Sequence, residues 1–463
     1  MKKKTLYILL ESQVRELESL ILLSALAAKR GYRVYMADHY SLLEIIKKKK
    51  SFGGIFITKG SSTIEVSKII KKKCNYNIIL DQEISPGYSK LYYDYILTGR
   101  QFKGSLKYVD RFYCVNKIVA ERAKKILNKS NKNLKVVTTG WPRLDLARKE
   151  FNGLFKKKSD QLKKKYKKFI LFNSDIGLVS NENIKEFEQT PIFTDKKKKF
   201  VKLNSKIRNN FKIHAIKDFN KVKIFFKKLS NNNNIPNIVI RPHPSETMSS
   251  WKKITDYSKN FFLEKPTYDV SAAILASNHV LHRGCTTGYQ ALVNGKPTGY
   301  LNLLNENKKI EHFRPTLLKF SKNLKSTNEF TKWTGSKKKI TKNRNLFKLL
   351  NIDHKYSAEK ILDDLDKLDV NLESNHKSFK LYSLQNIYYH KVKNLIYDTL
   401  VLLNIKKERN YHLKNRSKKI NNFFKKKNIS SCIKWFNENI KNLKNIEIKT
   451  KKISENLFEM QKK

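Results

Sequence analysis

Cysteine is scarce in this sequence, and long apolar runs are missing from it. The 463 residues include four cysteines, which lie far apart and form no Cys-x-x-Cys pair: Cys74, Cys114, Cys285 and Cys432. This spacing indicates neither a zinc site nor a disulfide framework and favours a reducing, cytoplasmic setting. No stretch approaches the ~18 apolar residues that a spanning helix requires. The apolar run in "MKKKTLYILLESQ" ends at Glu11, so we expect no signal peptide.

Acidic residues are also scarce relative to basic ones. The chain has 40 Asp and Glu against 98 Lys and Arg, which gives a net charge of +58. Such a charge permits nucleic-acid binding. However, the excess is mostly lysine spread along the whole chain, whereas nucleic-acid surfaces cluster their charge and favour arginine with aromatic residues. The many Lys, Asn and Ile residues indicate an A/T-rich genome. We therefore expect no specific nucleic-acid partner, but attraction to anionic membranes, which predicts a protein peripheral to the inner face of the cell membrane.

The length and the apolar content predict two α/β domains and an extension. Hydrophobic residues make up 40% of the chain, enough for two cores. Short apolar strands such as "TLYILL" and "GGIFIT" alternate with amphipathic helices such as "VRELESLILLSALAAKRG", the pattern of a parallel sheet. A second series begins at "KKFILFNSD". The predicted parts are a first Rossmann-like domain at 1–150, a linker at 151–168, a second Rossmann-like domain at 169–350 with an irregular insertion at 180–215, and a helical, Lys-rich extension at 351–463.

The segment "NIVIRPHPSET" places a polar loop directly after an apolar strand. Ligands of open parallel sheets bind outside the carboxyl ends of the strands. Two prolines stiffen this loop, and Arg and His are suited to phosphate oxygens. The structural alternative is a rigid loop with a buried, hydrogen-bonded histidine. In a second α/β domain we favour a donor-phosphate site made of Arg241, His243, Ser245 and Glu246.

The segment "HRGCTTGYQALVNGKP" predicts a strand, a tight turn and the start of a helix. Backbone N–H groups and hydroxyls at a helix N-terminus can hold an anion. Ordinary capping by threonine is the structural alternative. Because this segment comes one helical unit after "RPHP", we assign a second part of the donor site to Arg283, Gly284, Thr286, Thr287 and Gly288. Cys285 has no evident base partner and is not proposed as a nucleophile.

Carboxylates come directly after the strands of the first domain. In "IILDQEISPG", Asp81 or Glu83 could serve as general base on an acceptor hydroxyl, or as nucleophile at an anomeric carbon. Capping of a turn explains these acids equally well. The acceptor side of the site is predicted to include a second group of residues, for which ion pairing is the commoner explanation: Glu11, Arg15, Glu16 and Lys59.

The segment "TTGWPRLDLAR" closes the first domain. Gly140 and Pro142 predict a rigid bend, and Asp145 is expected to cap the segment after it. We interpret "TTGWPRLDLAR" as structural and, at most, as a wall of the cleft.

These motifs together resemble the bacterial surface-carbohydrate biosynthesis proteins, which are glycosyltransferase-like enzymes of the GT-B architecture. The matching pieces are "ESQVRELESLILLSALAAKRGYRV", "LDQE", "TTGWPRLDLAR", "IVIRPHPSE" and "HRGCTTGYQALVNGKP", which touch most of residues 5–300. The resemblance implies two Rossmann-like, doubly wound domains facing each other across a cleft. It covers neither the insertion nor the extension.

The His-Pro pair and the Thr-rich turn are also similar to those of bacterial sialyltransferases and Kdo transferases. This similarity implies that His243, Thr286 and Thr287 contact the phosphate of a CMP-linked donor, with no metal and no other cofactor. It also implies a catalytic carboxylate in the first domain. The family pattern Asp-Glu-Glu-Gly reads Asp-Gln-Glu-Ile here, so the assignment stays open between Asp81 and Glu83.

The resemblance predicts a metal-independent glycosyltransferase that moves a sugar from a CMP-activated acidic sugar to a lipopolysaccharide or capsule glycan, free or lipid-linked. The alternative is a CDP-polyol phosphotransferase of the teichoic-acid type, because "GWPRLD" resembles a segment of those enzymes. A nucleotide-sugar epimerase is a third interpretation, and a non-catalytic basic scaffold that binds membranes or nucleic acid is a fourth. In the extension, "YYHKVKNLIYDTLVLLNIKK" is amphipathic and suits either a membrane surface or packing onto the domains.

Overall fold

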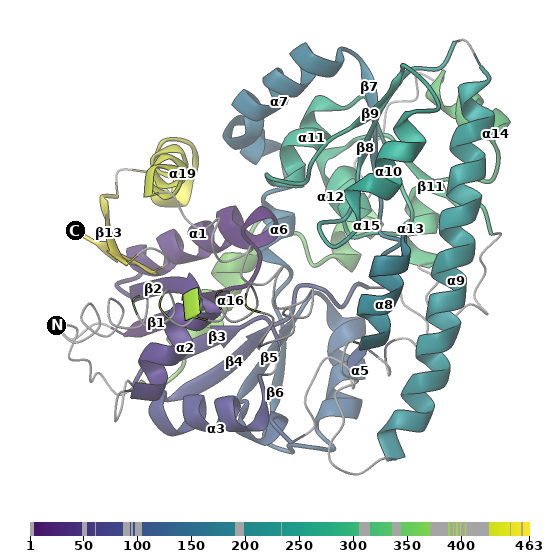
Figure 1. Cartoon of the computed structure of the whole chain (residues 1–463). Helices are drawn as coiled ribbons and strands as arrows, with labels where there is room; N and C mark the ends of the chain where they lie inside the picture. Colours follow the sequence, from purple (N-terminus) through teal and green to yellow (C-terminus); the bar gives the residue numbers. More distant parts are fainter. Residues whose placement is uncertain are drawn as a thin grey trace.

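The structure is a computed structural model of the whole chain (Figure 1). It describes residues 4–48, 53–60, 62–86, 93, 96–97, 104–189, 199–232, 234–304, 315–335, 344–370, 388, 392, 395–396, 399, 403, 426–444, 446–454 and 457–463.

The first domain is built on a parallel sheet of six strands in the order β2-β1-β3-β4-β5-β6. The strands are apolar on both faces because helices cover the sheet on each side; every residue of β1, for example, is buried. The strands are β1 Thr5–Leu10, β2 Arg33–Asp38, β3 Ile55–Thr58, β4 Tyr76–Leu80, β5 Arg111–Cys114 and β6 Lys135–Thr138. The helices are α1 Gln13–Lys29, α2 His39–Lys48, α3 Ile64–Lys73, α5 Lys117–Leu127 and α6 Pro142–Asp145.

The second domain repeats this plan with strand order β12-β11-β10-β7-β8-β9, all parallel. Its strands are β7 Phe169–Asn173, β8 Asn237–Arg241, β9 Phe261–Leu263, β10 His279–His282, β11 Thr298–Leu301 and β12 Lys322–Leu324. Its helices include α10 Met248–Thr255, α11 Val270–Ala276, α12 Thr287–Asn294, α13 Pro315–Phe320, α14 Thr327–Thr334 and α15 Arg344–Leu349. The predicted fold class, two doubly wound α/β domains in a GT-B-like arrangement, is confirmed (Figure 1).

The segment at 151–168, predicted to be a linker, is a helix of the second domain. It forms α7 (Asn152–Tyr166), which packs against α11. Phe155, Leu162 and Tyr166 lie on one face of this helix and are buried, while its lysines occupy the other face. The Lys-rich composition concealed this narrow apolar stripe.

The insertion at 180–215, predicted to be irregular, is largely helical. The chain forms α8 (Asn181–Gln189) and α9 (Lys199–Ser230), a helix of 32 residues along the outer side of the second domain (Figure 1). The C-terminal half of α9 buries Phe219, Val222 and Phe226 in the domain core. Because helix growth from such an anchored segment adds one hydrogen bond per residue, the polar N-terminal half continues the same helix.

The extension after 351 was predicted to be helical, but it ends in a hairpin. The helices α16 (Ser357–Asp366) and α19 (Lys426–Asn439) pack on α1. The strands β13 (Ile448–Ser454) and β14 (Leu457–Lys462) then form an antiparallel hairpin, and β14 pairs antiparallel with β2, with Met460 opposite Val34. The hairpin therefore covers the edge that β2 would otherwise expose, and the C-terminus lies against the first domain (Figure 1).

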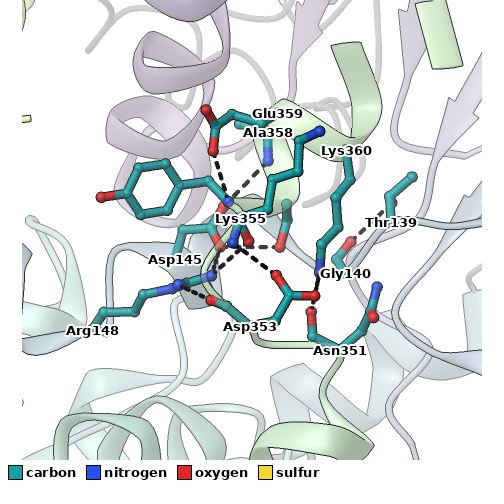
Figure 2. A network of polar contacts seen from close by, with 12 residues as sticks. Thr139, Gly140, Asp145, Arg148, Asn351, Asp353, Lys355, Ala358, Glu359 and Lys360 are labelled. Atoms are coloured by element: carbon teal, nitrogen blue, oxygen red, sulfur yellow. Dashed lines mark hydrogen bonds and ion pairs between the residues drawn. The ribbon is translucent and has the colours of Figure 1, made fainter. Parts of the chain in front are cut away.

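A polar network joins the two crossings of the chain between the domains (Figure 2). The Asp145 carboxylate, at the end of α6, accepts hydrogen bonds from the Ser357 hydroxyl (3.1 Å) and the Ala358 N–H (3.3 Å). Arg148 donates to Asp145 (3.1 Å) and to the backbone carbonyl of Asp353 (2.6 Å). Asp145 was predicted to cap the segment directly after it; it caps α16 instead, more than 200 residues further along the chain.

We predict that Phe458→Ala lowers the free energy of unfolding by about 3–5 kcal/mol, because this fully buried ring of β14 fills the core under α1. Urea unfolding measures the change. Lys451→Ala, at an exposed position of β13, is the matched control and should shift the free energy by less than about 0.5 kcal/mol. Equal, small effects of both substitutions would show that the hairpin does not belong to the folded core.

Candidate functional site

A cleft of about 300 Å³ lies where the carboxyl ends of both sheets meet. Side chains of both domains line it. The first domain contributes Arg15, Glu83 and Arg143, and the second contributes Arg241, His243, Thr286 and Thr287. Residues predicted from separate motifs, up to about 270 positions apart, therefore face a single hollow.

Arg241 ends β8 and lines this cleft. It is 6% exposed, stacks on the Tyr268 ring at 5.3 Å, and donates from Nη2 to the Tyr268 carbonyl at 2.5 Å. Among the residues that the structure describes, none accepts a hydrogen bond from its Nε. Burial lowers the pKa of Arg241. A buried cation with an unused donor is suited to an anionic ligand, whose charge would offset the cost of desolvation.

His243 lies next in the stiffened loop and lines the same cleft. Its Nδ1 lies 2.7 Å from the Ser245 hydroxyl and accepts a hydrogen bond from the Ser245 backbone N–H at 3.3 Å. An acceptor at Nδ1 favours the neutral tautomer that carries its proton on Nε2. Ser245 therefore orients the ring and does not line the cleft itself.

Glu246 lies behind the loop and holds it in place. Its carboxylate accepts from five donors: the Ser174 hydroxyl, the N–H groups of Ile176, Gly177 and His243, and the Trp251 indole N–H, at 2.8–3.3 Å. Burial raises the pKa of Glu246 to about 7, although the donors act in the opposite direction. Glu246 thus ties the loop after β7 to the loop after β8, and it is a positioning residue that does not line the cleft.

The predicted turn after β10 divides into residues that face the cleft and residues that do not. Thr286 caps α12 without a side-chain hydrogen bond, and both Thr286 and Thr287 line the cleft. Gly284 has a φ of +94°, which favours glycine. At Gly288 a Cβ atom would lie 2.9 Å from the His282 Nε2, so this glycine permits close packing of α12 on β10. The two glycines shape the turn without lining the cleft.

Arg283 was predicted to bind the donor, but the structure directs it away from the cleft. Its Nε and Nη2 lie 2.9 and 2.7 Å from the Asp218 carboxylate on α9, and it also bonds the Leu301 carbonyl. The side chain emerges on the opposite side of the chain from its neighbours in the turn. Its contacts fasten α9 to the sheet.

On the first-domain side, Glu83 is the predicted carboxylate that lines the cleft. The Lys59 ammonium lies 2.6 Å from Glu83 and 2.6 Å from Glu16, and 3.5 Å from Glu11. Arg15 also reaches Glu83 at 3.4 Å. Burial opposes the charge of Lys59, but the Glu16 and Glu83 carboxylates outweigh it and raise the Lys59 pKa. Of this group, Arg15 and Glu83 line the cleft. Lys59 holds Glu83 by an ion pair and is itself paired with Glu16 and Glu11.

Asp81, the other predicted acid, is fully buried and lies outside the lining. Its carboxylate accepts from the Ile84 N–H at 2.8 Å and the Glu83 N–H at 3.4 Å. It therefore shapes the turn that presents Glu83. Of the two acids, Glu83 is therefore the one that lines the cleft, and the catalytic role of either stays a prediction.

The segment "GWPRLD" was interpreted as structural and, at most, as a wall of the cleft, and Arg143 was not named as a site residue. Arg143 comes after β6 at the start of α6 and lines the cleft. The rule that ligands bind outside the carboxyl ends of parallel strands could have identified it. Asn173 and Asp175 after β7, and Asp269 before α11, also line the cleft and were not predicted.

Two carboxyl groups meet where α1 of the first domain faces α11 of the second. Burial and the nearby Asp269 carboxylate raise the pKa of Glu18 to about 8. Burial likewise raises the pKa of Asp269, although its carboxylate accepts from the Ser271 N–H at 2.7 Å. At neutral pH, Glu18 is therefore protonated, and the two groups avoid repulsion across the domain interface.

The part of the chain that the structure describes contains no group of three His, Cys, Asp or Glu side chains placed to hold a metal ion. The metal-independent chemistry implied by the resemblance stays a prediction.

No protein-family model matches the chain, and no curated protein matches it. Several solved structures have a similar fold. The UDP-GlcNAc 2-epimerase of Neisseria meningitidis bound to UDP-GlcNAc is 15% identical (TM-score 0.45; 79% of this chain and 100% of that chain covered). That of Methanocaldococcus jannaschii is 10% identical (TM-score 0.49; 79% and 99%), and the wall teichoic acid polymerase TagF is 12% identical (TM-score 0.44; 79% and 89%). At these identities and TM-scores, the similarities carry no argument about function.

We predict that the free energy of unfolding falls as the pH rises from about 4.5 to 8, because the raised pKa of Glu18 favours the protonated folded state. The stabilising contribution of Glu18 to the free energy of unfolding is complete below the pKa that Glu18 has in the unfolded chain. It is lost as the pH rises through the higher pKa that Glu18 has in the folded protein. Glu18→Gln should flatten this part of the profile by on the order of 3 kcal/mol, as measured by urea unfolding at a series of pH values. Glu121→Gln, at an exposed position of α5, is the control and should leave the profile unchanged; a Glu18→Gln profile that matches the wild type would contradict the prediction.

Proposed function

We propose that the protein is a glycosyltransferase that takes a sugar from a nucleotide donor and passes it to a surface-polysaccharide acceptor. The observation that carries this proposal is the facing arrangement in one cleft of phosphate-binding groups from the second domain and a carboxylate from the first. Arg241, His243 and the N-terminus of α12 suit the donor phosphate. The similarity of the His-Pro loop and the Thr-rich turn to those of sialyl and Kdo transferases supports a CMP-linked acidic sugar as the donor.

The chemistry assigned to these residues is displacement at the anomeric carbon. The acceptor oxygen forms a bond to this carbon while the bond to the phosphate oxygen breaks and its electron pair leaves with the phosphate. Arg241 and His243 stabilise the charge on the departing phosphate. Glu83, the first-domain carboxylate that lines the cleft and pairs with Lys59 and Arg15, accepts the proton of the acceptor hydroxyl. In the retaining alternative, Glu83 attacks the anomeric carbon first, and the acceptor displaces it.

A second function, transfer of a polyol phosphate from a CDP-linked donor, is favoured by one observation. Arg143 belongs to the segment "GWPRLD", which resembles part of the teichoic-acid type transferases, and it lines the cleft. The products distinguish the two reactions. Mass spectrometry after incubation with each donor would find a glycoside in the first case and a phosphodiester in the second.

We predict that His243→Ala weakens the binding of CMP about 10- to 100-fold, because the imidazole contacts the donor phosphate. Isothermal titration calorimetry measures the affinity. His354→Ala, at an exposed histidine outside the cleft, is the matched control. Glu83→Gln should bind CMP like the wild type and lose turnover.

The basic-scaffold alternative makes the opposite prediction for the same variants. Binding through surface lysines collapses as the salt concentration rises and does not depend on His243. Unchanged affinity of His243→Ala, together with such a steep salt dependence, would therefore contradict the transferase proposal.

We also propose that the protein acts at the inner surface of the membrane. None of the described helices is both long and apolar enough to cross a bilayer. However, five helical or adjoining positions of the extension expose apolar side chains at spacings of 3, 4 and 7 residues that fit one helix face: Tyr388, Val392, Leu395, Ile396 and Leu403. The excess of lysine over acid complements an anionic bilayer. An anionic lipid surface is therefore the partner proposed for this face.

We predict that the double variant Leu395→Glu/Ile396→Glu reduces binding to phosphatidylglycerol vesicles at least about tenfold, because both side chains would insert at the lipid interface. Vesicle flotation measures the bound fraction, and phosphatidylcholine vesicles show the contribution of charge. The matched control is Ile213→Glu/Ile224→Glu, which alters two exposed isoleucines of α9. If both double variants bind equally, charge alone attracts the protein and the helix face has no such role.

A further inference from the structure

Arg143 is a buried cation in the wall of the cleft whose donors are largely unused. It is 5% exposed, and within the described part of the chain its Nε and Nη2 have no hydrogen-bond acceptor. Its guanidinium stacks over the Trp141 ring at 4.7 Å. Burial, followed by the nearby Arg15 charge, lowers the pKa of Arg143 to about 10, so it is still charged at neutral pH. Buried charges in proteins are normally paired, because desolvation without a partner is costly.

The acids near Arg143 already serve other groups. Glu83 pairs with Lys59 at 2.6 Å and with Arg15 at 3.4 Å. Glu16 pairs with Lys59 at 2.6 Å and accepts two backbone N–H groups at the end of β1. Asp81 accepts the N–H groups of its own turn. These carboxylates moderate the charge of Arg143 from a distance but do not accept its hydrogen bonds.

The opposite wall of the same cleft contains a second guanidinium in a similar state. Arg241 is 6% exposed, stacks on an aromatic ring, and has an Nε without an acceptor. The two arginines come from different domains, Arg143 from the end of the first sheet and Arg241 from the end of β8. A single anion bound by Arg241 and the α12 N-terminus would leave Arg143 without a partner.

We propose that Arg143 forms a binding site for a second anionic group of the donor, separate from the nucleotide α-phosphate that Arg241 holds. This site rests on the proposed function and narrows its substrate class. The ligand would be a nucleotide that carries a further oxyanion, either the carboxylate of an acidic sugar or a second phosphate, and it would connect the two domains. Arginine suits either group, since its planar fork can bond two oxygens at once.

Calorimetry with CMP and CDP tests the second-anion site directly. We expect the wild type to bind CDP, or a CMP-linked acidic sugar, about 10- to 100-fold more tightly than CMP, since charge-assisted hydrogen bonds contribute this much. Arg143→Gln should remove this difference and leave the affinity for CMP within about twofold. Arg143→Lys, which keeps the charge but loses the fork, should retain part of it. Arg344→Gln, at an exposed arginine on α15, is the matched control.

The donor series identifies the source of the anion. A loss on Arg143→Gln that is larger for the CMP-linked acidic sugar assigns the site to a carboxylate, and a larger loss for a CDP-linked polyol assigns it to a phosphate. Thermal unfolding of each variant shows whether it is folded. If Arg143→Gln does not fold, Arg143→Lys is the variant used for the test. Equal effects of Arg143→Gln on CMP, CDP and the CMP-linked acidic sugar, or none on any of them, would overturn the second-anion site while leaving the nucleotide site intact. A wild type that binds no nucleotide would overturn the proposed function and this site with it.

Discussion

The cleft depends on the Asp145 carboxylate, which holds the two crossings between the domains together. The chain leaves the first domain through α6 and returns near Asp353 to enter α16. Asp145 caps α16 and pairs with Arg148. Arg148 in turn donates to the carbonyls of Asp353 and Lys355, in the loop by which the chain returns (Figure 2). Burial raises the pKa of Asp145 to about 6, although these donors act against it. Gly140 has a φ of +84°, and a Cβ there would collide with the Ser357 hydroxyl, so the bend admits only glycine.

The large positive charge of the chain gives little indication of how the site works. Its excess lysine is dispersed, whereas the cleft uses three arginines and one histidine in defined surroundings. In the first domain, Lys59 and Arg15 are balanced by carboxylates, so the charge there is largely neutralised. Arg143 and Arg241 remain as buried cations with unused donors. Under the proposed function, selectivity for an anion comes from the pairing of the buried charges and not from their total number.

Local patterns predicted much of the fold, because the strands are short apolar runs and the helices carry apolar stripes. The position of the loop after β8 at the cleft was also predictable, because a position directly after a buried strand lies at the ligand-binding edge of the sheet. Arg283 was assigned wrongly, since a sequence does not show that one residue of a tight turn points away from the next. To tell which of Asp81 and Glu83 lines the cleft likewise required knowing on which side of the turn each side chain lies.

Long-range contacts account for the other differences between prediction and structure. The hairpin at the C-terminus pairs with β2, more than 400 residues earlier, and its alternating lysines give no sign of that partner. The irregular appearance of 180–215 similarly came from polar residues whose helical state is supported by the buried half of α9. A distant strand decides the structure of the hairpin, and the adjoining buried half of the same helix decides that of the polar part of α9.

The short helix α6 connects the architecture of the molecule to its proposed selectivity. Within four residues it contains Arg143, which lines the cleft, and Asp145, which fastens the first domain to the returning chain. Pro142 at the start of α6 and the Trp141 ring beneath the guanidinium restrict the motion of Arg143 further. Because Arg143 is fixed on the first domain, it would bind a second anionic group only at a set distance from the anion bound by the second domain. A donor with one charged group would satisfy only one wall of the cleft, whereas a donor with two would pair both buried arginines.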